Sequence, residues 1–324
     1  MAVPDTLETA PLGPLTAPVG ARGVAVGATP ETMPAGQPAA WRDYLTLTKP
    51  RIMSLLVLTA VCSMFAAAGG DPHPLALLAL VVGGALACGG ASALNHVIDR
   101  DIDRLMGQRT ASRPVAAGRT SPRRAVIFGL VLSAMSFVIL VAFTNLLAAA
   151  LAVAGGAYYV VVYTVWLKRS TSQNIVIGGA AGAMPALSGW AAAHGELGLG
   201  AWLLFAIVLV WTPPHFWALA LLLKRHYAAA DVPMLPVVKG ARATSRQVLA
   251  YTVLLLLVAL IPVLTGTFGP VYAGAAVALG GVFTWLAWRL WHLRTPAAAG
   301  VVFHYSLLYL ALLFVAVAVD ASVR

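Results

Sequence analysis

The sequence NHVIDRDID runs from Asn95 to Asp103, and RTASRP follows it at residues 109–114. Between residues 95 and 124 the chain packs three carboxylates and seven arginines. This density stands out, because 60% of the 324 residues are hydrophobic and only 10% are charged. Long apolar runs precede and follow the segment. We therefore interpret it as a polar loop between two membrane-spanning helices, around which the rest of the chain is organised.

The first half of this segment has polar side chains at intervals of four residues. If the preceding apolar run continues as a helix, residues four apart advance by about 400° and return to nearly the same face. Asn95, Asp99 and Asp103 then form one stripe, whereas Asp101 points elsewhere. Two carboxylates and an amide oxygen are hard ligands of the kind that holds Mg²⁺ together with phosphate oxygens. The alternative is that the aspartates only pair with arginines in a solvated loop, but such a loop does not require this spacing.

The composition indicates a polytopic helical membrane protein. Mean hydropathy is +0.86. Uncharged apolar stretches of about 20 residues recur along the chain, each long enough to cross a hydrocarbon core of roughly 30 Å. The predicted fold class is therefore all-α, a bundle of nine transmembrane helices. The predicted spans are residues 52–69, 75–97, 125–143, 146–166, 175–194, 201–223, 248–268, 271–288 and 301–319.

The basic residues are distributed asymmetrically about these spans. Of the 21 Lys and Arg residues, all but Arg324 fall on the side of the N-terminus. By the positive-inside rule, the N-terminus and the long basic loops are cytoplasmic, and the C-terminus lies on the opposite side of the cell membrane. The net charge of +10 is therefore mainly a topology signal. It can also attract anionic lipid or substrate, and it does not indicate nucleic-acid binding.

The first 40 residues differ from the rest of the chain. They are rich in Ala, Pro, Gly and Thr and have no apolar periodicity. We predict a disordered cytoplasmic tail over residues 1–40 and a single membrane domain over residues 41–324. Cys62 and Cys88 both lie within predicted spans. We expect them to be small apolar core residues rather than disulfide partners or zinc ligands.

A weak internal repeat relates two loops. RPVAAG at residues 113–118 follows the second span, and LPVVKG at residues 235–240 follows the sixth. Because four spans separate them, both loops lie on the cytoplasmic side. We therefore expect two loops with aspartate and basic residues to converge on one site, although such repeats also occur in transporters.

Two further loop segments can contribute to this site. Residues 163–174 include adjacent Lys168 and Arg169, whose charged donors suit phosphate oxygens. Taken alone, that pair indicates a basic anchor at a helix end, and it suits a diphosphate only in company with the aspartate stripe. Asp231 is the only carboxylate in the loop after span six. If the two halves converge, Asp231 is the natural second metal ligand or base.

Span six contains WTPPHFW at residues 211–217. Consecutive prolines remove backbone donors and kink a helix, and polar groups at membrane depth usually face a protein cavity. His215 could therefore polarise, protonate or ligate a substrate in an aromatic pocket. Alternatively, it could only satisfy the carbonyl groups that the prolines free. We expect His304, alone in span nine, to be structural.

These segments resemble the intramembrane aromatic prenyltransferase superfamily from Trp41 to the C-terminus. The aspartate pattern between Asn95 and Asp103 is shared across that superfamily. The later blocks are similar to its haem-modifying branch. The other specific blocks are LTKPR (47–51), YTVWLKR (163–169), NIVIGGAAGA (174–183), PPH (213–215) and VPMLPVV (232–238).

The resemblance implies a nine-helix bundle around a central cavity and an Mg²⁺-dependent enzyme. The implied reaction joins the farnesyl group of farnesyl diphosphate to a vinyl group of haem b, with a hydroxyl added from water, to give haem O for terminal oxidases. Metal and cations would stabilise the departing diphosphate, and aromatic faces would shelter the allylic cation. Besides membrane lipid, the implied partners are a haem A synthase or the terminal oxidase assembly.

Together with the residue patterns, the resemblance assigns roles to numbered positions. The metal is expected at Asn95, Asp99 and Asp103. Catalytic roles are expected for Asp99, Asp103, Asp231 and His215. The diphosphate is expected to contact Asn95, Arg109, Arg113, Tyr163, Lys168 and Arg169. Where the family usually has an acidic residue before a tyrosine in the loop after span six, this chain has His226, so the second acidic cluster is reduced to Asp231.

Two alternatives share part of this pattern. Prenyl transfer to a quinone precursor or a chlorin would use the same aspartate motif with different later loops. A multi-span transporter would place ionisable residues near the bilayer midplane, whereas every acidic residue here lies outside the predicted spans. We therefore expect an enzyme that acts at the membrane face.

Overall fold

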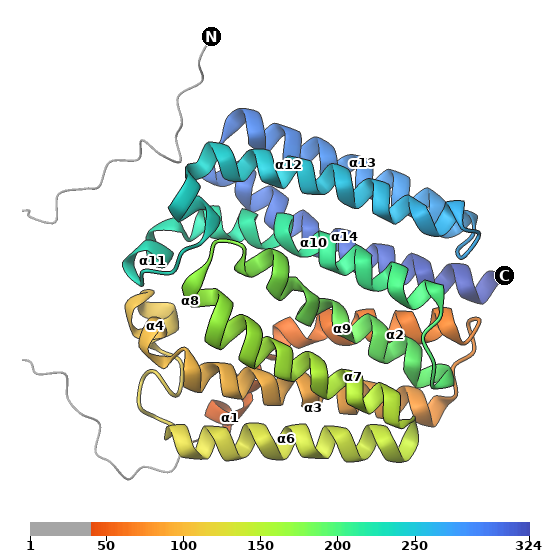
Figure 1. The fold of residues 1–324 in the computed structure, drawn as a ribbon, viewed down its shortest axis with the longest axis horizontal. Coiled ribbons are helices and arrows are strands. Elements are labelled where there is room, and N and C mark those ends of the chain that lie inside the picture. Colours follow the sequence, from red (N-terminus) through yellow and green to blue (C-terminus); the bar gives the residue numbers. More distant parts are fainter. Residues whose placement is uncertain (1–39) are drawn as a thin grey trace, which may run out of the picture.

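The structure is a computed structural model that describes residues 40–324, and those residues form only helices and the turns between them (Figure 1). The tail predicted for residues 1–40 lies outside the described residues apart from Ala40, which precedes α1 (Trp41–Thr48). Within the described part, nine helical segments are long and apolar enough to cross a membrane. They are α2 (Pro50–Ala67), α3 (Pro74–Ile98), α6 (Pro122–Phe143), α7 (Leu146–Ala157) with its continuations η1 (Tyr158–Leu167) and α8 (Lys168–Ser170), α9 (Asn174–His194), α10 (Leu199–Leu222), α12 (Leu235–Leu264), α13 (Pro270–Leu293) and α14 (Pro296–Val323). The chain is an all-α integral membrane protein, as predicted.

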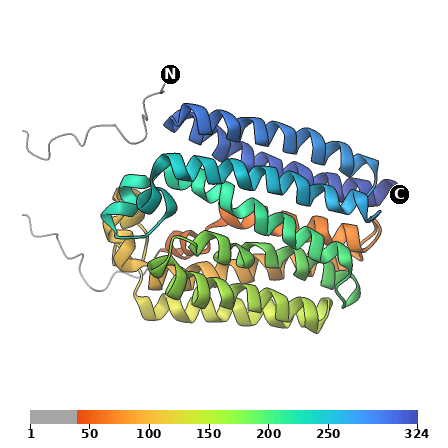
Figure 2. The same ribbon diagram turned by 45° about the horizontal axis from the view of Figure 1, so that its top comes forward.

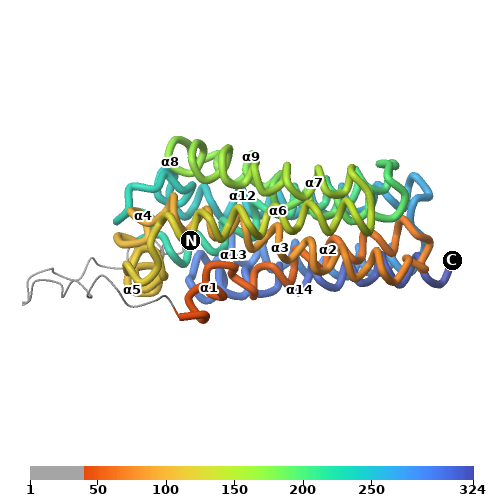
Figure 3. The backbone as a smooth tube through the Cα atoms, turned by 90° about the horizontal axis from the view of Figure 1, so that it is seen from below, coloured from red at the N-terminus to blue at the C-terminus, as the bar shows by residue number. Residues whose placement is uncertain are grey.

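The long helices run side by side along one axis of the molecule (Figure 2). The helix α10 packs against α9, α12, α14 and α2, so it lies at the centre of the bundle. Three short helices gather with α8 at one end, which we call the site end (Figures 1 and 3). These are α4 (Arg100–Leu105), α5 (Gln108–Ala111) and α11 (Lys224–Ala229). The C-terminus lies at the opposite end.

The observed helices coincide with the nine predicted spans, with one large difference in length. The helix α12 begins at Leu235 rather than at residue 248. Its first part carries Lys239, Arg242 and Arg246, which exclude it from an apolar span. The prediction therefore recovered only the apolar part of α12, and Gly240, with φ 74°, breaks the helix within its charged part.

A ten-residue π-helical segment, η1, was not predicted. Its wider turn is visible in the backbone bond from the N–H of Lys168 to the carbonyl of Tyr163, five residues earlier. π-Helical turns recur at functional sites because they change the direction in which side chains project. Here the segment directs Thr164 towards α3, where it accepts a hydrogen bond from Asn95 at 3.2 Å.

One buried acidic residue lies just beyond the predicted ninth span, which ends at residue 319. Asp320 lies within α14 and is fully buried. It occupies the end of the bundle opposite the site, where its carboxylate accepts bonds from the backbone N–H groups of Gly269 at 2.6 Å, Val271 at 3.1 Å and Tyr272 at 3.2 Å. Gly269 is the N-cap of α13, and Val271 and Tyr272 lie in its first turn, where N–H groups have no acceptor within the helix. Asp320 is therefore a cap that joins two spanning helices.

Replacing this cap is expected to destabilise the protein. In Asp320→Ala, three backbone donors lose a buried charged acceptor, and we expect a loss of about 2–4 kcal/mol in unfolding free energy. The measurement is the melting temperature of the purified protein in detergent. Asp320→Asn keeps one acceptor oxygen and should lose about half as much. An unchanged melting temperature in Asp320→Ala would show that the cap is dispensable.

Candidate active site

The predicted stripe exists and crosses a helix joint. The helix α3 ends at Ile98 and α4 begins at Arg100, yet the backbone bonds Asp99 N to Asn95 O (2.9 Å) and Asp103 N to Asp99 O (2.8 Å) keep the four-residue repeat. Asn95, Asp99 and Asp103 are no more than 2% exposed. Asp101 points away from them, and its side chain is 60% exposed.

Each aspartate of the stripe is paired through one oxygen only. The Lys168 ammonium lies 2.6 Å from Asp99 Oδ2, and the Arg113 guanidinium lies 2.6 Å from Asp103 Oδ1. Asn95 Nδ2 also donates to Asp99 Oδ2 at 2.7 Å. The second oxygens, Asp99 Oδ1 and Asp103 Oδ2, are buried without any hydrogen-bond partner among the described residues. A buried carboxylate oxygen without a donor is costly, so these two atoms suit a ligand that supplies positive charge.

A divalent metal fits these oxygens. Mg²⁺ is commonly bound through one or two carboxylates together with water and phosphate oxygens, and two free carboxylate oxygens one helical turn apart meet that requirement. In the described part of the chain, no group of three or more His, Cys, Asp or Glu side chains could hold a metal by itself. Burial raises the pKa of Asp103 above its ordinary value, while the charge of Arg113 opposes this rise. The site therefore favours additional positive charge.

Lys49 belongs to this site, although the sequence analysis did not assign it. Its ammonium donates to Asn95 Oδ1 at 2.8 Å, so the amide oxygen predicted as a third metal ligand is engaged by a cation. Lys49 joins α1 to α2 with a left-handed φ of 52°, a conformation that costs energy for a residue with a side chain. Burial lowers the pKa of Lys49 to about 7, and the charge of Arg113 acts in the same direction. The sequence signal that could have indicated this turn was Pro50, because the residue before a proline is disfavoured in a helix.

The adjacent residues Lys168 and Arg169 point to different partners. Lys168 reaches the stripe, whereas Arg169 forms two bonds of 2.7 Å with the carboxylate of Asp101 and a third with the carbonyl of Ile98 at 2.9 Å. These bonds hold the pKa of Asp101 well below its usual range. Arg169 therefore ties α8 to the joint between α3 and α4. Its predicted contact with a diphosphate would require this pair to open.

The remaining predicted diphosphate contacts differ in exposure. Arg109 is exposed on α5. Tyr163 is half-buried on η1, stacks on Tyr159 with ring centroids 5.6 Å apart, and packs directly against Gly178 of α9. The two tyrosine rings form an aromatic surface close to the stripe, because Thr164, the next residue of η1, accepts a hydrogen bond from Asn95.

The two loops predicted to converge do meet. Gly107, between α4 and α5, lies so close to His226 of α11 that a β-carbon there would be 2.8 Å from the imidazole ring. The glycines that end the two repeats also share a conformation, with φ 75° at Gly118 and 74° at Gly240. Asp231 follows α11 as an exposed residue with a left-handed φ of 51°. Thus His226 forms the observed contact between the loops.

Tyr227, next to His226, is a second residue that the sequence analysis did not assign. It is buried, and burial raises its pKa to about 12. The charges of Arg113 and Asp99 both act on it, in opposite directions. A neutral phenol therefore lies beside the charged stripe and can donate a hydrogen bond. No spacing rule distinguishes it from the other tyrosines of the chain.

His215 lies in α10, which continues through Pro213 and Pro214. Its ring stacks between Trp211, with centroids 4.5 Å apart, and Phe303 of α14 at 5.0 Å. Its Nδ1 lies 2.6 Å from the hydroxyl oxygen of Ser306. By contrast, His304 is exposed and bonds only to the carbonyl of Gly300 in its own helix, which fits the structural role predicted for it.

The hydrogen bonds of Ser306 favour one tautomer of His215. The Ser306 hydroxyl has one hydrogen, and it donates that hydrogen to the carbonyl of Phe303 at 2.6 Å. Its oxygen must then accept from His215 Nδ1–H. A neutral imidazole that makes this bond carries its lone pair on Nε2, which can accept a proton or ligate a metal. Among the described residues, the imidazole bonds to Ser306 and to none of the carbonyl groups that the prolines free.

Comparison with known proteins gives the family. A family model described as UbiA prenyltransferase matches residues 56–316. The chain belongs to the UbiA prenyltransferase family. A relative from Gloeobacter violaceus named protoheme IX farnesyltransferase is 51% identical over 289 residues, which cover 87% of this chain and 93% of the relative. A relative of the same name from Thermus thermophilus is 48% identical over 94% of this chain, but the chain spans only 50% of its length.

Solved structures of the UbiA family share the fold. A digeranylgeranylglyceryl phosphate synthase aligns with a TM-score of 0.72 and 18% identity over 87% of this chain and 99% of its own. A UbiA homologue from Archaeoglobus fulgidus, bound to DMAPP and Mg²⁺, aligns with a TM-score of 0.67 and 15% identity over 84% of this chain and 99% of its own. At these identities the likeness establishes the fold alone, and it confirms the predicted helical bundle.

Proposed function

We propose that this enzyme transfers the farnesyl group of farnesyl diphosphate to a vinyl group of haem b, with addition of a hydroxyl, to give haem O. The observation that carries the proposal is the 51% identity to a protoheme IX farnesyltransferase over 93% of that relative. The buried, incompletely paired aspartates with three cations around them add chemical support, because they suit a metal-bound diphosphate.

Asp99 Oδ1 and Asp103 Oδ2 would hold the metal in this proposal. A structural neighbour is bound to DMAPP and Mg²⁺, and such a metal would supply positive charge to the diphosphate oxygens here. Lys168, Arg113 and Lys49 already lie on the stripe and stabilise the charge that develops on the departing diphosphate. Arg109 and Arg169 are more exposed and are assigned to the approach of the substrate.

The bond-making and bond-breaking steps use the aromatic side chains and the imidazole of His215. The bond between the allylic carbon and the diphosphate oxygen breaks, and the diphosphate leaves with the electron pair. The vinyl group of haem b forms the new carbon–carbon bond, water adds to the resulting cation, and a proton leaves. The stacked rings of Tyr159 and Tyr163 shelter the allylic cation. We assign to His215 Nε2 the acceptance of the proton from water, and to Asp231 a supporting role at the second loop.

The orientation that we propose follows from the charge asymmetry. The site end and its basic loops face the cytoplasm, and the C-terminus faces the other side of the cell membrane. Haem O would then leave through the membrane towards a haem A synthase or a terminal oxidase under assembly.

The test is a product assay by mass spectrometry on membranes that contain the protein, with haem b, farnesyl diphosphate and Mg²⁺. We expect a hydroxyethylfarnesyl haem, and we expect a chelator to abolish it. If haem b were unchanged while a quinone precursor was prenylated, the haem assignment would be wrong and family membership would stand.

A further inference from the structure

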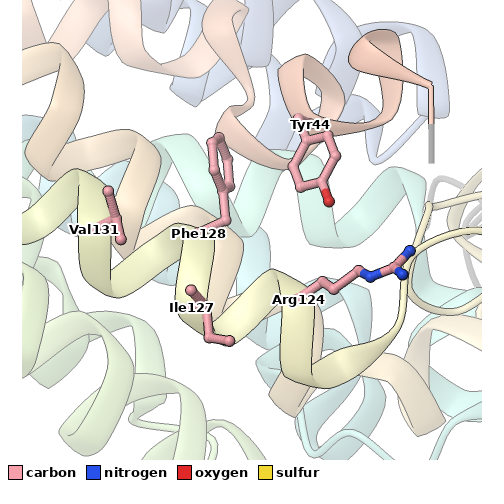
Figure 4. A pocket seen from close by; sticks show the side chains of 5 residues that line it. All are labelled: Tyr44, Arg124, Ile127, Phe128 and Val131. Atoms are coloured by element: carbon pink, nitrogen blue, oxygen red, sulfur yellow. The ribbon is translucent and has the colours of Figure 1, made fainter. Parts of the chain in front are cut away.

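A groove outside the proposed active site lies between α1 and α6 (Figure 4). It has a volume of about 400 Å³. Its lining residues are Tyr44, Arg124, Ile127, Phe128 and Val131. Tyr44 belongs to α1 and the others to α6, and the rings of Tyr44 and Phe128 meet edge to face at 5.0 Å. The groove is therefore built where a short surface helix lies against a spanning helix.

The two ends of the groove differ in chemistry. The guanidinium of Arg124 and the hydroxyl of Tyr44 lie at one end, and Val131 lies at the other, deeper along α6 (Figure 4). Neither polar group has a side-chain partner among the described residues. Asp43, the carboxylate of α1, is already paired with Arg119 at 3.0 Å. An unpaired cation and an unpaired hydroxyl therefore mark the polar end.

The apolar end faces the lipid. Ile127 is 52% exposed and Val131 is 48% exposed, and both project from a helix that crosses the membrane. Hydrocarbon must cover such side chains in a bilayer, while Arg124, in the first turn of α6, lies at the level of the headgroups.

We propose that this groove binds one anionic phospholipid. The phosphate is held by the guanidinium of Arg124 and the hydroxyl of Tyr44. One acyl chain lies along Ile127 and Val131. Charge complementarity selects an anionic headgroup over a zwitterionic one, because no carboxylate of the groove balances Arg124.

A lipid in this position would also act on the proposed active site. It would contact α1 and α6 together, and α1 ends at the strained residue Lys49, which reaches Asn95. We therefore expect phosphatidylglycerol to slow amide hydrogen exchange in Trp41–Thr48 compared with phosphatidylcholine. Equal exchange rates in the two lipids would overturn this bracing role.

The binding test is native mass spectrometry of the purified full chain with equal amounts of phosphatidylglycerol and phosphatidylcholine of the same chain length. The wild type should retain phosphatidylglycerol preferentially. Arg124→Gln should lower that occupancy about fivefold, which corresponds to about 1 kcal/mol for one basic side chain at the membrane surface. Arg123→Gln is the matched control, because Arg123 is an exposed neighbour that does not line the groove.

A second pair of variants tests the acyl end without a change of charge. Ile127→Trp should fill the groove and displace the lipid, whereas Leu130→Trp, at a similarly exposed position of α6 outside the groove, should not. The proposal is overturned if the wild type retains both lipids equally, or if each variant and its control lose lipid to the same extent.

Discussion

Asp99→Asn and Asp103→Asn are each expected to abolish turnover, with a fall in kcat of about a thousandfold or more, equivalent to about 4 kcal/mol of lost transition-state stabilisation. Each substitution removes the charge of one carboxylate. The oxygen without a hydrogen-bond partner, Asp99 Oδ1 in one case and Asp103 Oδ2 in the other, then no longer offers that charge to a metal. The measurement is the rate of product formation in membranes with a matched amount of protein.

The same substitutions leave a buried cation without its counter-charge, so folding must be checked separately. Asp99→Asn strands Lys168, and breaking such a pair costs about 3–5 kcal/mol of stability. The double variant Asp99→Asn with Lys168→Met removes both charges and should fold, yet it should remain inactive. Restored turnover in the double variant would show that Asp99 serves only to neutralise Lys168.

Asp101→Asn provides the matched control for the stripe. Asp101 is two residues away, carries the same charge, and is exposed in a surface pair with Arg169. Such pairs contribute about 0–1 kcal/mol, so the variant should keep most of its activity. If Asp101→Asn were as inactive as Asp103→Asn, the assignment of the metal to one face would be wrong.

The sequence was sufficient for the parts of the fold that depend on one-dimensional signals. Apolar length gave the nine spans, and the spacing of four placed Asn95, Asp99 and Asp103 on one face. The prediction from sequence failed where a helix continues into charged residues. The charged start of α12 is helical on both sides of the break at Gly240, and α14 continues past the predicted span to Asp320, whose carboxylate accepts three backbone N–H groups at the start of α13.

The partners within the site needed three-dimensional information. Lys168 and Arg169 are adjacent and chemically alike, and only the fold sends one to Asp99 and the other to Asp101. Lys49 lies 46 residues before Asn95 and reaches it through a left-handed turn that composition does not reveal. Long-range pairs of this kind are set by packing, which no local pattern encodes.

Replacing His215 is expected to have the second large effect on turnover. His215→Ala should lower kcat by about a hundredfold to ten-thousandfold, the range for loss of a general base. The Michaelis constant for farnesyl diphosphate should stay unchanged, because the stripe is intact. If His215→Ala kept near-normal kcat, the ring would contribute only its packing between Trp211 and Phe303.

Ser306 separates the chemistry of His215 from its packing. Ser306→Ala keeps the imidazole but removes the acceptor of Nδ1–H, so the proton can move to Nε2 and the lone pair is lost from that atom in part of the population. We expect kcat to fall about tenfold, since general-base catalysis depends on the correct protonation state.

Ser188→Ala is the control for the loss of a buried hydrogen bond. It removes another buried hydroxyl, which donates to the carbonyl of Ala148 at 2.9 Å. A fall in kcat in Ser306→Ala alone, at equal melting temperatures, would identify Ser306 as the residue that positions the proton of His215. Equal rates in the two variants would mean that the tautomer has no part in the reaction.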